Sequence, residues 1–361
     1  MYITHIQNKN TMQILARSRL HALSISLLCI SLLIIPSSAN NPTPARRPPR
    51  QLSVNYYAKS CPNLDQLVAS VTSQQFKESP VSGPATIRLF FHDCFVEIVI
   101  QGCDASILIS TKPGSRELAE KEAEDNKDLR TEGFDTVHKA KALVESKCPG
   151  AVSCSDILAI AARDFVHLAG GPYYQVKKGR WDGKFSKSTT VANNIPRANS
   201  TVDELLNLFA SKGLSLQDMV VLSGAHTIGF AHCKQFVGRL YNYRGTKRPD
   251  PEMDPRLLKA LRMSCPQFGG GAGVVAPFDV TTPFLFDHAY YGNLEGKLGL
   301  LASDQGLALD PRTGPVVRLL GKDKERFFEW FAVAMEKMGS VGVKRGRRHG
   351  ERRRDCTVHV S

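Results

Sequence analysis

The spacing of apolar residues most limits what this chain can fold into. Between Leu64 and Met338, apolar side chains recur at intervals of three and four residues in one segment after another, which is the period of an amphipathic helix. Alternation of apolar and polar residues, which indicates a strand, is scarce, and residues 173–176 offer the best example. The sequence therefore predicts a mainly α fold.

Eleven segments share the helical period. They are 64–76, 85–94, 134–146, 155–168, 202–212, 216–222, 227–241, 255–265, 287–296, 313–320 and 324–338. Asp203 and Ser215 lie near the start of two of these segments and are predicted N-caps. Ser215 and Asp218 have the spacing of a capping box, which strengthens the second assignment.

The first 39 residues are predicted to be a secretory signal. Lys9, Arg17 and Arg19 precede an apolar run at 22–35, and small residues up to Ala39 provide a cleavage site. A membrane anchor is the less favoured alternative, because the run is short and contains serines. No other stretch of the sequence is long and apolar enough to cross a bilayer.

Residues 40–50 are rich in proline and arginine and predict an extended leader, after which one folded domain is expected from 51 to 361. The formal net charge is +13, and residues 344–354 hold seven Lys and Arg side chains against one acid, Glu351. In a secreted monomer we expect neither nucleic acid nor membrane as a partner of this basic tail. An acidic cell-wall polysaccharide is the candidate partner, and a solvated basic loop without a partner is equally open.

Nine cysteines are present, and Cys29 lies within the predicted signal. The remaining eight are an even number in a chain expected to enter an oxidising compartment, which predicts four disulfides. Eight cysteines permit 105 pairings, so their connectivity stays open at this level. None of them shows the Cys-x-x-Cys spacing of a structural zinc site.

One segment, Ile87 to Cys94, combines groups suited to catalysis. On a helix, Arg88 and His92 stand four residues apart with Phe91 between their turns, so a cation, an imidazole and an aromatic ring share a face. A fixed guanidinium beside an imidazole suits a reaction in which a proton moves while charge develops on an oxygen. The alternatives are a core helix with two polar groups, or a metal-dependent hydrolase that uses His92 and Asp93.

A second histidine, His226, is flanked by small residues from Ser223 to Gly229. Small neighbours would let a bulky planar ligand approach the backbone closely. A metal-bound histidine nearly always donates its other ring N–H to an acceptor, and Asp304 is a candidate for that acceptor.

Five motifs follow one another along the chain. They are Arg-Leu-Phe-Phe-His-Asp-Cys-Phe-Val from Arg88, Gly-Cys-Asp-Ala-Ser from Gly102, Val-Ser-Cys-Ser-Asp-Ile-Leu from Val152, Leu-Ser-Gly-Ala-His-Thr-Ile-Gly from Leu222 and Ser-Asp-Gln from Ser303. Together they resemble the secretory plant haem peroxidases, the class III family, over about residues 51–356. The resemblance implies the plant haem-peroxidase fold, with haem b between distal and proximal helical halves. It also implies that hydrogen peroxide is reduced to water while phenolic donors are oxidised by one-electron steps.

The resemblance assigns roles to the two histidines and to residues near them. It makes His226 the ligand of the haem iron and Asp304 the acceptor behind it. On the distal side, His92 would move a proton between the peroxide oxygens while Arg88 stabilises the developing charge. Phe91 would limit access to the iron.

Four further residues are singled out in the same way. Asn126 would orient the distal histidine, with Glu120 as the acid of the same network, and the carbonyl of Pro196 would help to hold the donor. Asn199, in the only glycosylation sequon, is the expected glycan acceptor and lies near the presumed donor channel.

The resemblance also implies two structural calcium ions held by oxygen ligands. The distal set is Asp93, the carbonyls of Val96 and Gly102, Asp104 and Ser106. The proximal set is Thr227, Asp279, Thr282, the carbonyl of Leu285 and Asp287. The implied disulfides are Cys61–Cys148, Cys94–Cys103, Cys154–Cys356 and Cys233–Cys265.

The chain departs from the family between Val96 and Gly102, where Glu97 is followed by four additional residues, Ile98 to Gln101. This insert falls inside the distal calcium loop and inside the Cys94–Cys103 ring. Either the loop bulges outward and the site survives, or the ion and the disulfide are compromised. The second outcome leads to an alternative function, a wall-bound haem- or polysaccharide-binding protein with impaired catalysis.

Overall fold

The computed structural model describes residues 51–96, 102–268 and 273–359. The predicted signal, the leader and the insert with Glu97 lie outside the described residues. The described part is mainly helical, as the apolar period predicts, and contains one small antiparallel sheet. In this part of the chain, no helix has the length and apolar character needed to span a membrane.

The element order is as follows. The α-helices are α1 (Leu64–Glu78), α2 (Ser82–Phe95), α3 (Thr131–Lys147), α4 (Cys154–Leu168), α5 (Val202–Ser211), α6 (Leu216–Ser223), α7 (Val237–Tyr241), α8 (Pro255–Ser264), α9 (Ala289–Glu295), α10 (Ala302–Leu309), α11 (Gly314–Leu320) and α12 (Lys324–Met338). The 3-10 turns used below are η1 (Ser106–Leu108), η2 (Glu120–Glu122) and η4 (Gly224–Thr227), and the strands are β1 (Phe230–His232) and β2 (Val275–Pro277).

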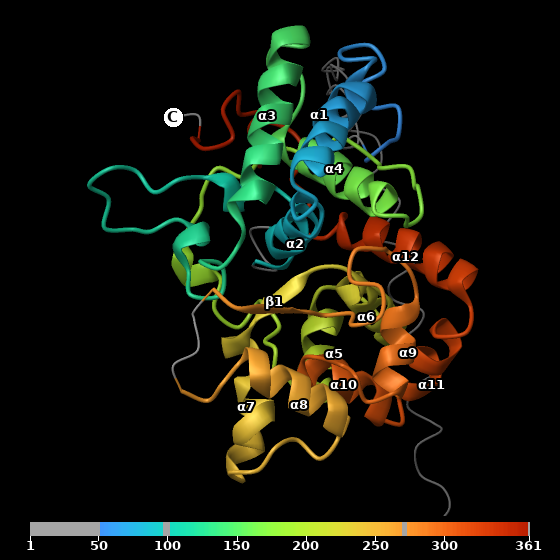
Figure 1. Cartoon of the computed structure of the whole chain (residues 1–361). Coiled ribbons are helices and arrows are strands. Elements are labelled where there is room, and N and C mark those ends of the chain that lie inside the picture. The colour runs from blue at the N-terminus through green and yellow to red at the C-terminus, as the bar shows by residue number, and fades with distance from the viewer. Residues whose placement is uncertain (1–50, 97–101, 269–272, 360–361) are drawn as a thin grey trace, which may run out of the picture. The chain divides into compact units, whose positions relative to one another are not determined.

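Helices α1 to α4 form one half of the fold, which Figure 1 shows in its upper part. Helix α4 buries every residue from Cys154 to Val166, because apolar and small side chains surround its axis on all sides. Helices α1, α2 and α3 pack against it. In α2 most side chains are buried, and Arg88 and Phe91 are among those that stay more open.

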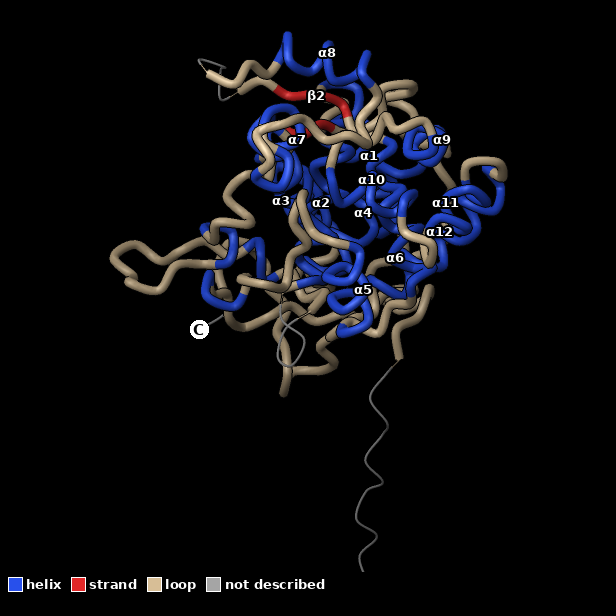
Figure 2. The backbone as a smooth tube through the Cα atoms, turned by 90° about the horizontal axis from the view of Figure 1, so that it is seen from below, coloured by secondary structure: helices blue, strands red, loops and turns tan. Residues whose placement is uncertain are grey.

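Helices α5 to α11 form the other half, in the lower part of Figure 1, with β1 between the two groups. Here the aromatic side chains of Phe286, Tyr290 and Tyr291 pack with Phe327 and Phe331 of α12, and all five are at most 1% exposed. Strand β1 pairs with β2 so that Phe230 faces Pro277, and Figure 2 shows β2 beside α8. This sheet and helices α7 and α8 surround a second, smaller core.

The structure corrects the predicted helix at 227–241. Gly229 has φ +103°, a left-handed conformation that ends the turn before it, and β1 begins at the next residue. Only the last five residues of the segment form an α-helix, α7, and a 3-10 turn at Cys233–Gln235 precedes it. The pairing partner of β1 is β2, more than 40 residues further along the chain, so the local apolar pattern could not reveal it.

Two other local predictions were wrong, and one was confirmed. Residues 173–176 are extended but belong to no strand of the described chain, while α10 was not predicted. The N-cap of α5 is Thr201 rather than Asp203, because Thr201 forms a reciprocal capping box with Glu204. The predicted capping box at Ser215 is present.

Four disulfides join the pairs that the resemblance implies. They are Cys61–Cys148, Cys94–Cys103, Cys154–Cys356 and Cys233–Cys265. Cys94–Cys103 therefore closes across the insert, and Cys154–Cys356 attaches the C-terminal segment to the buried helix α4.

Candidate active site

A cavity of 1540 Å³ brings the two histidine motifs together. Helix α2 contributes Arg88, Phe91 and His92 to its lining, and the turn η4 contributes His226. Small-molecule sites usually measure about 300–1,000 Å³, so this space admits a larger ligand. Two imidazoles from distant parts of the sequence therefore line one cavity.

A chain of hydrogen bonds orients His92. Its Nδ1 lies 2.7 Å from Oδ1 of Asn126, whose amide nitrogen donates to the main-chain carbonyl of Glu120 at 2.9 Å. Asn126 must therefore present its oxygen to the ring, and His92 donates from Nδ1. The Nε2 atom is left as the acceptor, and Nε of Arg88 donates to it at 3.2 Å.

The surroundings keep His92 uncharged. Burial and the positive charge of Arg88 lower the pKa of His92 to about 3, although Asn126 partly opposes this change. At neutral pH the imidazole therefore has a lone pair on Nε2 that can accept a proton. Arg88 is further held by a bond from Nη1 to the carbonyl of Asp128 at 3.4 Å.

The predicted access residues also line the cavity. The ring of Phe91 packs on Phe95 with a centroid distance of 4.2 Å and closes part of the space beside His92. Pro196 and Asn199 line the cavity as well, on the chain segment that leads into α5.

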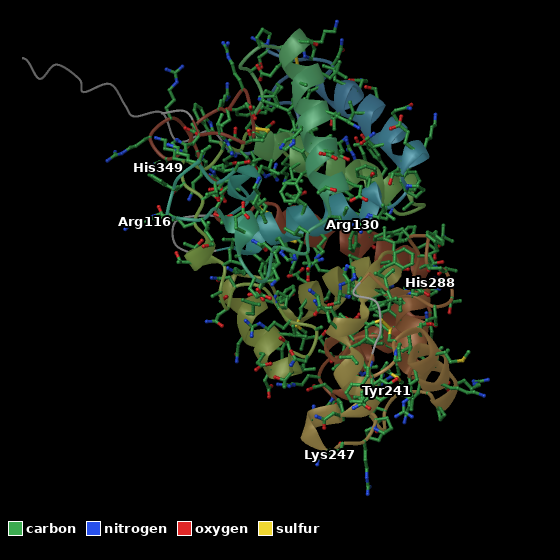
Figure 3. All side chains as sticks on the ribbon, turned by 60° about the vertical axis from the view of Figure 1, so that its left-hand side comes forward. Arg116, Arg130, Tyr241, Lys247, His288 and His349 are labelled. Carbon is green, nitrogen blue, oxygen red and sulfur yellow. A yellow bond between two sulfur atoms is a disulfide. The ribbon has the colours of Figure 1, made fainter. Side chains whose placement is uncertain are left out.

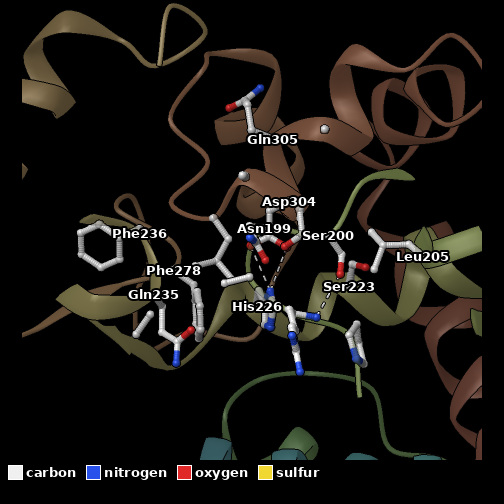
Figure 4. Close-up of a pocket in the computed structure, with 18 of the residues that line it drawn as sticks. Asn199, Ser200, Leu205, Ser223, His226, Gln235, Phe236, Phe278, Asp304 and Gln305 are labelled. Atoms are coloured by element: carbon white, nitrogen blue, oxygen red, sulfur yellow. Dashed lines mark hydrogen bonds and ion pairs between the residues drawn. The ribbon is translucent and has the colours of Figure 1, made fainter. Parts of the chain in front are cut away.

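His226 lies on the opposite side, held by a carboxylate and an aromatic ring. Its Nδ1 is 3.1 Å from both oxygens of Asp304, which α10 supplies (Figure 4). The ring of Phe278 stacks on the imidazole with a centroid distance of 4.2 Å and an interplanar angle of 10°. In the described chain Nε2 has no hydrogen-bond partner, and the side chain is 37% exposed while Asp304 is buried. This arrangement leaves Nε2 available to a metal.

Of the small residues around His226, Ser223, Ala225 and Gly229 line the cavity, and Gly224 packs against a neighbouring ring. A Cβ atom on Gly224 would lie 2.3 Å from Oη of Tyr291, so only glycine fits against that ring. Gly229 is required for its positive φ angle. Phe278, which sequence reasoning missed, comes directly after β2 and reaches the ring because β2 pairs with β1.

The five predicted proximal calcium ligands converge on one point. Oγ1 of Thr227 lies 3.3 Å from Asp279, 3.4 Å from Asp287 and 3.4 Å from the carbonyl of Leu285. Oγ1 of Thr282 lies 3.3 Å from Asp279 and 3.1 Å from Asp287. Oxygens that bind one calcium ion at 2.3–2.6 Å stand about 3.2–3.7 Å apart when they are at right angles. A hydroxyl has only one proton to share among three acceptors, so this oxygen shell fits a cation.

The predicted distal ligands lie beside a carboxylate that was not in the predicted set. Asp93, Asp104 and Glu120, named here the distal acidic cluster, are all fully buried. One oxygen of each has no hydrogen-bond partner in the described chain: Oδ1 of Asp93, Oδ2 of Asp104 and Oε1 of Glu120. Burial raises the pKa values of Asp93 and Glu120 well above their usual range, and that of Asp104 to about 6. Unpartnered buried carboxylate oxygens of this kind suit calcium, although in the described residues no group of three or more His, Cys, Asp or Glu side chains is gathered closely enough to hold a metal ion by itself.

Of the remaining predicted distal ligands, Ser106 and Gly102 contact this cluster. The amide of Ala105 donates to Asp93 at 2.9 Å, the amide of Ser106 donates to Asp104 at 3.1 Å, and Oγ of Ser106 donates to Glu120 at 3.0 Å. Val96 ends α2, and the carbonyl of Gly102 accepts from the amide of Asp104 at 2.6 Å.

The structure refines the prediction for Glu120. It contacts Asn126 through its main-chain carbonyl, while its carboxylate points to Ser106. Its backbone thus belongs to the histidine network and its side chain to the distal acidic cluster. The sequence contains no signal for the second part, because a local pattern does not indicate that an acid in a 3-10 turn is buried.

The fold and the site together define a class of protein, the haem peroxidases. They combine two helical halves, a cavity between two imidazoles and the oxygen shells. The sequence profile of the peroxidase family matches residues 68–323, and the chain belongs to this family. Peroxidase 19 of Arabidopsis thaliana is 64% identical over 350 residues, which cover 94% of this chain and 100% of that protein. Peroxidase 55 of the same plant is 47% identical over 308 residues, covering 85% of this chain and 90% of its own length.

These similarities confirm the resemblance to the class III plant peroxidases. The chain is a peroxidase enzyme, and its family implies a haem cofactor, hydrogen peroxide and an electron donor as reactants. The alternative of a binding protein with impaired catalysis is not favoured. The metal-dependent hydrolase is not supported either.

Proposed function

We propose that this peroxidase acts outside the cell and reduces hydrogen peroxide between Arg88, His92 and a haem held by His226, with phenolic donors oxidised at the cavity mouth. The proposal rests on one observation, which is that two imidazoles with different hydrogen-bond partners line the same cavity. One is neutral and faces a guanidinium, and the other is backed by a carboxylate.

Nε2 of His226 would hold the haem iron, since Nδ1 is committed to Asp304. A bound haem supplies the redox centre through which electrons from the donor reach the peroxide. The carboxylate of Asp304 makes the imidazole a stronger electron donor, and Phe278 fixes the plane of the ring.

His92 would transfer the proton of the reaction. Its Nε2 takes a proton from one oxygen of peroxide and returns it to the other oxygen, which leaves as water. The bond from Nδ1 to Asn126 keeps the ring in the tautomer that this step needs. Arg88, whose Nε reaches the same point of the cavity, stabilises the negative charge that develops as the oxygen–oxygen bond breaks.

Phenolic donors would bind at the mouth of the cavity. The carbonyl of Pro196 is available to accept the hydroxyl proton of a phenol, and Phe91 narrows the space nearest His92. Small donors would reach this position more easily than bulky ones.

Two calcium ions would bind the oxygen sets described above and stabilise the walls of the cavity. The proximal ion would lie next to His226, because Thr227 belongs to its shell. The distal ion would lie next to His92, because Asp93 follows it in α2.

For the domains, we propose a cleaved signal at 1–39, a leader at 40–50 and a monomeric peroxidase domain at 51–361 with a glycan on Asn199. Entry into the secretory pathway accounts for four disulfides. Asn199 is exposed, as glycan attachment requires.

The basic tail would contact an acidic cell-wall polysaccharide through its four exposed arginines, because its other three basic side chains pack against the protein. Arg352 lies over the ring of Trp181 at 4.8 Å, Arg353 is fully buried and Lys344 is mostly buried. The exposed arginine set comprises Arg345, Arg347, Arg348 and Arg354. In Figure 3, His349 marks this segment at the end of the molecule opposite Lys247.

The test is a purified, disulfide-bonded chain reconstituted with hemin. It should show a haem absorption band and oxidise guaiacol only when peroxide is present. His92→Leu should keep the band and lose most of the peroxide-cleavage rate. A colourless wild-type product, or near-normal turnover in that variant, would refute the proposal.

A further inference from the structure

The C-terminal segment lies directly on the distal loop. The amide of Cys103 donates to the carbonyl of Val341 at 3.1 Å, and a Cβ atom on Gly102 would lie 2.4 Å from that carbonyl oxygen. The amide of Trp181 donates to the carbonyl of Lys344 at 3.2 Å. These backbone contacts fix the position from which the side chain of Lys344 starts.

That side chain reaches the distal acidic cluster. Nζ of Lys344 lies 4.0 Å from Oδ2 of Asp104, the oxygen that has no hydrogen-bond partner in the described chain. The side chain of Lys344 is 15% exposed and that of Asp104 is 0% exposed, so solvent screens this pair weakly. The ammonium is a little too distant for a direct hydrogen bond, so it acts mainly through its charge.

A second cation, Arg353, lies behind the cluster, and its positive charge acts on all three carboxylates and partly opposes the rise that burial causes in their pKa values. Arg353 is fully buried and donates to the carbonyls of Ala105 at 2.7 Å and Cys356 at 2.7 Å. Its Nε lies 3.9 Å from Oδ2 of Asp182 and has no hydrogen-bond partner in the described chain. Lys344 is thus the cation of this pair that faces an unpartnered oxygen of the cluster.

We propose that Lys344 is an internal counter-ion of the distal calcium site, which weakens calcium binding there and keeps the site folded when the ion leaves. The inference rests on the calcium site of the proposed function. A calcium ion and the ammonium would draw on the same carboxylate of Asp104 and would repel each other. Without calcium, the ammonium partly balances the buried carboxylate of Asp104, in addition to the charge of Arg353.

The consequence reaches the catalytic network through contacts already described. Within the cluster Ser106 connects Asp104 to Glu120, and the carbonyl of Glu120 holds Asn126 against His92. If Lys344 maintains the cluster, calcium loss from the distal site leaves His92 oriented.

The experiment uses the haem-loaded protein and calcium itself as the probe. Calcium is titrated against a chromophoric chelator, and thermal unfolding is followed with calcium and with EGTA. Asp93→Asn assigns the distal step, because it removes a carboxylate of that site only. Lys344→Met removes the charge and keeps the apolar stem, and Lys259→Met on the exposed face of α8 removes a matched charge elsewhere.

Calcium binding at the distal site is the step that Asp93→Asn abolishes. In Lys344→Met, the dissociation constant of this step should fall about tenfold or more. The reason is that an ammonium and a calcium ion that share one carboxylate repel each other appreciably even when they are screened as in water. The same variant should lose more thermal stability in EGTA than the wild type does. Lys259→Met should match the wild type, and Lys344→Gln should repeat the direction of the Lys344→Met result.

Unchanged or weaker calcium binding in both Lys344 variants would overturn the proposal, as would a calcium stoichiometry that Asp93→Asn does not reduce. None of these readouts depends on peroxide turnover. A protein that binds calcium as stated but fails to oxidise guaiacol would refute the proposed function and leave this inference standing.

Discussion

Replacing Asn126 by leucine tests how the chain keeps His92 in its reactive form. Leucine has the same branching at Cγ but offers neither acceptor nor donor. The change removes the acceptor 2.7 Å from Nδ1 of His92 and the donor 2.9 Å from the carbonyl of Glu120. The variant therefore changes hydrogen bonding more than volume.

The magnitude follows from the cost of a buried N–H without a partner, which is about 1–3 kcal/mol. His92 can reduce this cost by moving its proton to Nε2, but Nε2 then no longer accepts the bond from Nε of Arg88. Because the two costs oppose each other, the tautomer with a free lone pair on Nε2 should become up to about 10-fold less populated. Because peroxide cleavage needs that lone pair, its rate should fall by a similar factor.

Stopped-flow absorption at the haem band, with peroxide in excess, measures this rate apart from donor oxidation. Haem content is determined separately and should stay at the wild-type level. Asn126→Asp keeps an oxygen acceptor at Nδ1, so at pH 8 it should retain clearly more of the rate. Asn126→Leu with full haem content and the wild-type peroxide rate would refute the reasoning. An equal loss in both variants would mean that packing, not proton position, is what Asn126 supplies.

Three further changes test other parts of the site. Asp304→Asn should leave His226 in place but weaken its electron donation, so the midpoint potential of the bound haem should rise in a spectroelectrochemical titration, and an unchanged potential would contradict the role of the carboxylate. Asp279→Asn should remove the proximal calcium and lower the melting temperature, measured in the presence of calcium, by about 5–10 °C. This is the effect expected from the loss of a ligand present at about 100 times its dissociation constant. Equal melting temperatures of the variant and the wild type would argue against this site. Replacing the exposed arginine set by glutamine should lower the salt concentration that elutes the protein from polygalacturonate, with Lys259→Gln as the single-charge control, and elution at unchanged salt would exclude the set as the contact.

Most of the helices could be predicted because each contains its own apolar stripe. The predicted segment 324–338 coincides with α12, and Ser215 begins α6 through a capping box formed by residues three positions apart. The prediction failed at 227–241, where Gly229 and the pairing of β1 with β2 decide the backbone. Pairing between remote segments leaves no trace in the period of either one.

The candidate site divides in the same way. Four-residue spacing on one helix was enough to place Arg88 beside His92, whereas for His226 the residues offered Asp304 only as a candidate acceptor, which the family resemblance then assigned. The tertiary structure alone revealed that Phe278 stacks on His226 and that the carboxylate of Glu120 joins a buried acidic cluster.

The sequence by itself thus determined the helical class, the chemical groups and, through its motifs, the family. Only the tertiary structure decided which buried charges meet and which oxygen atoms lack a partner, as the approach of Lys344 to Asp104 illustrates. The physical reason is range. Helical periods and caps act within a few residues, while burial and charge compensation depend on segments that packing and disulfides bring together from opposite ends of the chain.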